Sequence, residues 1–189
     1  MKKRLFALSM AIILSLCCIG CGSSEPEAPA EEQKIEEPVK DERGITGSKY
    51  TDICDMMSAM GFPKHDVNYL PEEDLYLVPY CTAEDVYSYA YGISFTDDYE
   101  IIDASFSMAN INLKDGTTFL KDTITFFTVG TAFSYDTLDH DKLMKWLEDN
   151  TNTLEDVEIV IGDAKYSMYT TVQDSGLATA RSLYIEKAK

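Results

Sequence analysis

The feature that most constrains the fold is an alternation of apolar and small side chains over residues 86–95. Tyr87, Tyr89 and Tyr91 share one side of this stretch with further apolar residues, while serine, alanine and glycine occupy most positions between them. Because successive side chains of a β-strand point to opposite faces of a sheet, this period of two is typical of a strand. We expect a strand with one aromatic face and one small-residue face.

Further turns and alternations extend this strand into an antiparallel arrangement. The sequence Thr-Asp-Asp at 96–98 predicts a turn before a return strand over about 102–108. A Lys-Asp-Gly turn at 114–116 is of the type found in hairpins and leads into a long strand or strand pair around 120–133. Three more strands are expected near the C-terminus. Strands should therefore cover most of residues 86–108, 118–134 and 157–187.

Two segments have helical spacing. Over residues 48–60, apolar side chains recur every three or four positions, with Ser48 as the expected N-cap and Gly61 just beyond the end. Over residues 139–150, Asp139 is the expected N-cap. These elements predict an α+β domain in which two helices pack on a largely antiparallel sheet of six or seven strands.

The order of the predicted elements repeats once along the chain. In each half a helix precedes a strand that opens with Tyr-Ser, at Tyr87-Ser88 and again at Tyr166-Ser167. Either the chain is a duplicated helix-plus-hairpin unit, or two unrelated meanders share a similar composition. This element order resembles the tandem units of the beta-lactamase-inhibitory protein family. The resemblance implies helices on one face of a curved antiparallel sheet, with the other face free to bind.

The first twenty residues have the composition of a secretory signal. Lys2, Lys3 and Arg4 precede an apolar run that ends near Ile19. This run is shorter than the roughly 20 apolar residues of a transmembrane helix. Residues 1–20 are therefore predicted to be a signal peptide.

The end of this signal resembles the lipobox of bacterial lipoproteins, with the sequence Ile19-Gly20-Cys21 followed by Gly-Ser-Ser. Cys18 stands three positions before Cys21, where leucine is usual. The resemblance implies that Cys21 carries a lipid, so that the protein is attached to the cell membrane and faces the extracytoplasmic side. An ordinary cleaved signal and an uncleaved anchor are the alternatives.

A tether and one domain are expected to follow Cys21. From residue 22 to residue 46 the chain has eight acids, three bases and three prolines. A segment with this composition buries too little apolar surface to offset the entropy lost on ordering, so residues 21–46 are predicted to be a disordered linker. Residues 47–189 are long enough for a single globular domain with its own core.

The chain is strongly acidic, with a formal net charge of −17 at pH 7. This charge argues against nucleic acid as a partner, because contacts with phosphates need a basic surface. The membrane is expected as a partner only through the lipid on Cys21. An unknown protein, peptide or glycan remains as the partner that the domain itself would bind.

The sequence contains no motif for catalysis or for binding a nucleotide or a metal ion. It has no G-x-S-x-G elbow, P-loop or H-E-x-x-H motif. Its two histidines, His65 and His140, are not in a metal-ligand spacing. We therefore expect no cofactor, no metal and no enzymatic activity, with a small hydrolase as the less favoured alternative.

Cys54 and Cys81 are the two cysteines outside the signal region. In an exported protein such a pair predicts a disulfide, which would close a loop of about 27 residues and add roughly 3 kcal/mol of stability. Alternatively, Cys54 is a buried thiol on the apolar face of the first predicted helix.

Tyr87, Tyr89 and Tyr91, here called the tyrosine row, are the candidate ligand surface. Exposed aromatic rows bind sugars and peptides, although such a row can also form the core of a sheet. If the row is core, the next candidates are the small-residue face, the acidic turns at Asp97 and Asp174, and the irregular segment 71–80. The expected function is a non-catalytic binding or accessory module on the membrane, with a self-assembling structural or stress-related envelope protein as the alternative.

Overall fold

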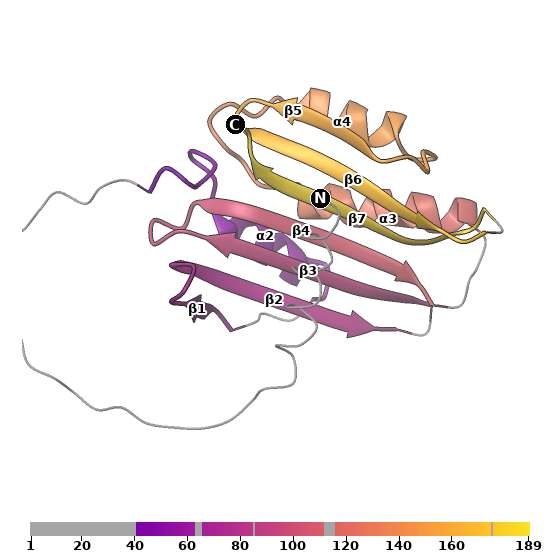
Figure 1. Cartoon of the computed structure of the whole chain (residues 1–189), viewed down its shortest axis with the longest axis horizontal. Helices are drawn as coiled ribbons and strands as arrows, with labels where there is room; N and C mark the ends of the chain where they lie inside the picture. The colour runs from indigo at the N-terminus through magenta and orange to yellow at the C-terminus, as the bar shows by residue number, and fades with distance from the viewer. Residues whose placement is uncertain (1–40, 63–65, 85, 112–115, 175) are drawn as a thin grey trace, which may run out of the picture. The chain divides into compact units, whose positions relative to one another are not determined.

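The computed structural model describes residues 41–62, 66–84, 86–111, 116–174 and 176–189, which contain three helices and seven strands (Figure 1). The helices are α2 (Tyr50–Ala59), α3 (Gly116–Gly130) and α4 (His140–Asp149). The strands are β1 (Asn68–Leu70), β2 (Leu75–Ala83), β3 (Tyr87–Phe95), β4 (Ile101–Asn110), β5 (Val157–Ile161), β6 (Ala164–Val172) and β7 (Ala178–Lys187).

All seven strands form one antiparallel sheet in the order β1-β2-β3-β4-β7-β6-β5. The helices lie on one face of this sheet (Figure 1), where the buried side chains of the strands meet them. Ile93, Phe106 and Leu183 are fully buried on this face. The predicted α+β class, with helices on a largely antiparallel sheet of six or seven strands, is confirmed, and the sheet has seven.

Apart from the additional edge strand β1, the two halves of the sheet have the same order of strands outward from its centre. There β4 pairs with β7, and Phe106 lies opposite Leu183. Moving outward from this pair, β3 and β2 follow on one side, and β6 and β5 follow on the other. The order of the strands is therefore the one that a duplicated unit would give, with the two copies related by a twofold rotation.

The strand predicted around residues 120–133 is wrong, because residues 116–130 form the helix α3 and the residues after it are not in a strand. Threonines and phenylalanines favour strands, but the buried side chains of this segment recur at helical spacing. Gly130 allows close contact with the sheet, since a Cβ atom there would lie 2.6 Å from the ring of Phe106. The buried positions are Phe119, Leu120, Thr123, Phe126, Phe127 and Gly130. The domain therefore has a third helix where two were predicted.

Of the two predicted N-caps, one is confirmed and one is wrong. Asp139 caps α4, accepting a hydrogen bond from the backbone N–H of Lys142 at 3.0 Å. Lys49, not Ser48, occupies the N-cap position of α2. The hydroxyl of Ser48 instead donates to the carbonyl oxygen of Ile45 at 2.6 Å and accepts from the N–H of Ile101 at 2.9 Å. A buried serine thus joins the entering chain to the start of β4.

The folded unit begins earlier than predicted, at Asp41 rather than near residue 47. Ile45 is fully buried, and its N–H donates to the carbonyl oxygen of Ile101 at 2.7 Å. Residues 41–46, which were assigned to the linker, therefore belong to the domain. The predicted signal peptide, Cys21 and the rest of the linker lie outside the described residues.

Candidate functional site

The tyrosine row faces the helices. Tyr91 is 3% exposed, so of the two alternatives, exposed ligand surface or core, this residue takes the second. Tyr87 and Tyr89 are half-buried, and their rings lie 5.8 Å from Phe119 and 5.3 Å from Phe126 respectively. The row packs the sheet against α3 and offers little free ring surface to a ligand.

No disulfide joins Cys54 and Cys81. Cys54 lies on α2 and packs against the core on the helix-covered face of the sheet. Cys81 is exposed on β2, where its neighbour Tyr80 points into the core. Because adjacent strand residues point to opposite faces, the two thiols lie on different sides of the sheet. The predicted bridge could not form without rearranging β2.

Two segments from the list of alternative surfaces come together at one end of the sheet. They are the segment 71–80 and the acidic turn that follows β3. The expectation of irregular structure is wrong for residues 75–80, which belong to β2. Antiparallel pairing of β2 with β3 places Tyr76 opposite Phe95, so the start of one strand lies beside the end of the other. The β1–β2 turn and the β3–β4 turn are therefore neighbours at the same end of the sheet (Figure 1).

Five aromatic rings lie together at this end of the sheet, and we call them the aromatic end. Phe95 is 1% exposed and stacks on Tyr50, with ring centroids 3.7 Å apart and planes 6° from parallel. Tyr76 stacks on Phe95 at 5.3 Å. Tyr69 lies 5.0 Å from Tyr76, and Tyr99 lies 5.9 Å from Tyr50. The rings form a continuous path from the core to solvent, where Tyr69 is 49% and Tyr99 is 58% exposed.

The hydroxyl groups of two of these rings are bound to carboxylates. Tyr69 donates to Oδ1 of Asp74 at 2.9 Å, and Tyr76 is hydrogen-bonded to Asp97. In each case the hydrogen bond to the carboxylate is the main cause that raises the pKa of the phenol above its ordinary value. Each carboxylate is therefore held beside a ring.

Tyr99 has an unusual backbone conformation, with φ = 68°. Its N–H donates to the carbonyl oxygen of Thr96 at 2.9 Å, and its carbonyl oxygen accepts from the N–H of Tyr50 at 3.2 Å. A left-handed conformation costs a side chain with a Cβ atom about 1–2 kcal/mol, so glycine is the usual residue at such a position. Here the position is occupied by a tyrosine that is 58% exposed.

Acidic side chains surround the aromatic end, and we call them the acidic rim. The two turns contribute six acids and no base. Apart from the half-buried Glu100, these side chains are exposed. The members of the acidic rim are Glu72, Glu73, Asp74, Asp97, Asp98 and Glu100. The site therefore combines open ring faces with concentrated negative charge.

One cation of this chain, Arg43, lies against the rim. Its guanidinium donates to the backbone carbonyl oxygens of Glu73 and Asp74 at 2.9 and 2.6 Å. It also forms a salt bridge of 2.6 Å with Asp41 and a longer one of 3.8 Å with Asp74. The charge of Arg43 is thus matched mainly by Asp41, a carboxylate outside the rim.

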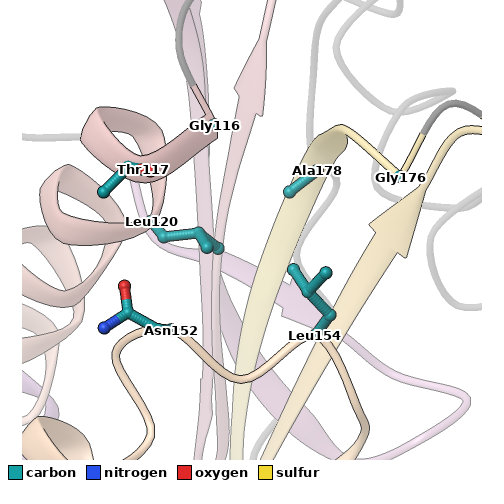
Figure 2. Close-up of a pocket in the computed structure, with 7 residues that line it drawn as sticks. All are labelled: Gly116, Thr117, Leu120, Asn152, Leu154, Gly176 and Ala178. Carbon is teal, nitrogen blue, oxygen red and sulfur yellow. The ribbon is translucent and has the colours of Figure 1, made fainter.

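The opposite end of the sheet has an open pocket of about 430 Å³ between α3, the loop after α4 and β7 (Figure 2). The loop is held by Arg181, which is 1% exposed and donates to the carbonyl oxygens of Asn150, Thr151 and Thr153. Burial lowers the pKa of Arg181 to about 10. The lining residues are Gly116, Thr117, Leu120, Asn152, Leu154, Gly176 and Ala178, none of them charged.

Neither a metal site nor a membrane-spanning helix is found in the part of the chain that the structure describes. Within it, no three histidine, cysteine or acidic side chains converge to hold a metal ion. None of the described helices is long and apolar enough to cross a bilayer.

Comparison with protein-family models, with curated proteins and with solved structures finds no match to this chain.

Proposed function

We propose that this protein is an extracytoplasmic lipoprotein, attached to the cell membrane through Cys21, which acts as a non-catalytic binding or accessory module. Its ligand-binding surface is the aromatic end together with the acidic rim. The lipobox-like sequence that ends at Cys21 supports the anchor. Attachment through two or more acyl chains is stable, whereas one chain binds a bilayer only marginally.

The exposed ring of Tyr99 is the observation that carries the binding role. A tyrosine in the left-handed region costs stability, and this ring is more than half exposed, so it recovers little by burial. Residues held in unfavourable backbone conformations cluster at ligand-binding sites. The position of Tyr99 is explained if its ring contacts a partner.

The anchor is tested by replacing Cys21 with serine. We expect Cys21→Ser to leave an uncleaved precursor that lacks the mass of the acyl chains, as measured by mass spectrometry of the intact protein. A wild-type mature N-terminus that maps to a residue other than Cys21 would contradict the lipoprotein assignment.

The binding surface is tested by placing a photo-crosslinking amino acid at position 99 of the full chain in intact cells. The matched control is position 160, because Val160 is also exposed, at 52%, but lies at the far edge of the sheet on β5. We expect crosslinked products from position 99 that are absent from position 160. Equal crosslinking at both positions would contradict the assignment, and a crosslink to a second copy would favour the self-assembling alternative.

A further inference from the structure

We infer that the partner of the aromatic end is a cationic protein segment that presents lysine or arginine side chains to Tyr69, Tyr99 and the acidic rim. This inference rests on the proposed binding function and names the chemistry that the site recognises. It is carried by the exposed ring faces, by the charge around them, and by the way Arg43 is bound beside them.

The exposed rings favour a cation by their electrostatics. The face of a tyrosine ring carries the negative side of its quadrupole and attracts lysine and arginine side chains. The hydroxyl of Tyr69 already donates to Asp74, and that of Tyr76 is hydrogen-bonded to Asp97. These hydroxyl protons are therefore not available to a neutral or anionic ligand, and a carboxylate lies next to each ring.

The negative charge of the acidic rim also favours a cationic partner. Its six carboxylates lie in two adjacent turns that contain no basic residue. The whole chain is also acidic, with a formal net charge of −17, so it repels anionic partners and steers basic ones toward it. An anionic lipid surface or a nucleic acid would meet unfavourable charge at this end.

Arg43 shows how a guanidinium binds at this edge. Two of its nitrogens donate to the carbonyl oxygens of Glu73 and Asp74, and its charge is paired with Asp41. These contacts use the backbone of the β1–β2 turn. The carboxylates of Asp97 and Asp98, on the neighbouring turn beside Tyr99, make no described salt bridge. A second guanidinium or ammonium group would find its counter-charge there.

The spread of the site favours an extended segment over a single ion. No three described carboxylates converge as metal ligands, yet exposed rings and acids continue from Tyr69 on β1 to Tyr99 on the β3–β4 turn. A peptide with several basic side chains can contact both turns at once. The site therefore matches a basic segment better than a small cation.

Hexa-arginine and hexa-lysine peptides are the probes, titrated into the full chain in a non-ionic detergent by isothermal titration calorimetry. We expect both to bind, with affinity that falls between about 20 and 150 mM salt because screening weakens exposed charge interactions. Tyr99→Gly should weaken binding by about three- to five-fold, the loss expected for one exposed cation–π contact. A Gly-Ser peptide of equal length should not bind.

A matched pair of double variants separates this site from the general acidity of the chain. Asp97→Asn with Asp98→Asn removes two adjacent exposed acids from the rim, and Glu155→Gln with Asp156→Asn removes two adjacent exposed acids elsewhere. We expect the first pair to weaken hexa-arginine binding by at least about five-fold and the second by less than about two-fold. Equal weakening by both pairs would overturn the inference, because it would show attraction to net charge alone.

Two other outcomes distinguish failure of this inference from failure of the proposed function. If chitohexaose binds in a Tyr99-dependent way and the basic peptides do not, the ligand class is wrong but the binding surface stands. If no basic peptide binds, the inference is overturned, and the crosslinking at position 99 decides separately whether this surface binds any partner.

Discussion

The turns that join β3 to β4 and β6 to β7 have the same backbone hydrogen bonds but different residues at their left-handed position. In the first, Thr96 N–H donates to the carbonyl oxygen of Glu100, and Tyr99 N–H donates back to Thr96. In the second, Gln173 and Leu177 form the equivalent bond, and Gly176 takes the place of Tyr99. The φ angles are 68° for Tyr99 and 81° for Gly176.

This difference separates the conformation that the turn requires from the side chain that the sequence places there. The turn needs a residue that tolerates positive φ, and Gly176 meets this need without strain. A register shift precedes each turn, between Ser94 and Phe95 in β3 and between Thr171 and Val172 in β6. Because the two turns share these hydrogen bonds and register shifts, the turn itself does not require a tyrosine at position 99.

The strands that lead into the two turns also differ. Counted back from the turns, Phe95 corresponds to Val172, and Tyr91 corresponds to Met168. Phe95 is buried under stacked tyrosines, whereas Val172 is 37% exposed. The core positions of β3 and β6 are thus both apolar. Only at the end of β3 do aromatic rings extend from the core to the solvent-exposed surface.

The largest effect is expected from truncating the matched core positions. Tyr91→Ala should lower the free energy of unfolding by about 3–5 kcal/mol and Met168→Ala by about 2–5 kcal/mol, because each opens a cavity under the helices. Urea denaturation of the full chain measures both. Tyr99→Ala is the control and should cost less than about 1 kcal/mol. A loss below about 1 kcal/mol for Tyr91→Ala would show that the tyrosine row is not core.

A reciprocal exchange at the left-handed positions should have a smaller effect and tests the comparison directly. Gly176→Ala should cost about 1–2 kcal/mol from backbone conformation alone, since no atom lies within 4 Å of the added Cβ. Tyr99→Gly should change stability by less than about 1 kcal/mol, because the relief of strain offsets the greater entropy of an unfolded glycine. Thermal or urea denaturation provides the measurement. A loss above about 2 kcal/mol for Tyr99→Gly would mean that the ring is structural, and the comparison would fail.

The smallest effect concerns the ion pair at the aromatic end. Hydrogen bonds from Arg43 hold the pKa of the Asp41 carboxyl below its ordinary value. The contribution of this ion pair to stability is therefore present above about pH 4, and it is lost as the pH falls through the lowered pKa of Asp41. Asp41→Asn should remove a few tenths of a kcal/mol at pH 6 and almost nothing at pH 2. An equal loss at both values would show that the contact does not depend on charge.

Sequence patterns predicted the helices α2 and α4 and the strands β3 to β7, because local periodicity and burial agree there, whereas β1 and β2 lie outside the predicted strand spans. Alternation located β3 and β4, and Asp139 marked the start of α4. The helix α3 was missed because its threonines favour a strand locally, while its contacts with Phe106 and the sheet decide its conformation. The sequence repeat pairs Tyr87 with Tyr166, but alignment of the two turns makes Tyr89 the counterpart of Tyr166.

The candidate site was only partly predictable. The turn at Asp97 and the segment 71–80 were alternatives in the sequence, yet nothing indicated that they are neighbours, because this depends on the register between β2 and β3. The conformation of Tyr99 was hidden as well, since a turn is recognised in sequence by glycine or asparagine at its left-handed position. An aromatic residue next to two acids in a predicted turn was the one available signal.

The attachment of the entering chain to β4 has a mechanical consequence. The N–H of Ile45 and the hydroxyl of Ser48 bind Ile101, two residues from Tyr99, and the backbone of Glu42 accepts a bond from Lys187 at 2.5 Å. Tension applied to the chain at Asp41 therefore enters the domain at the corner that carries the aromatic end. A load between an anchor upstream and a partner held at Tyr99 would therefore act first on these contacts near the aromatic end and on the bond to Lys187.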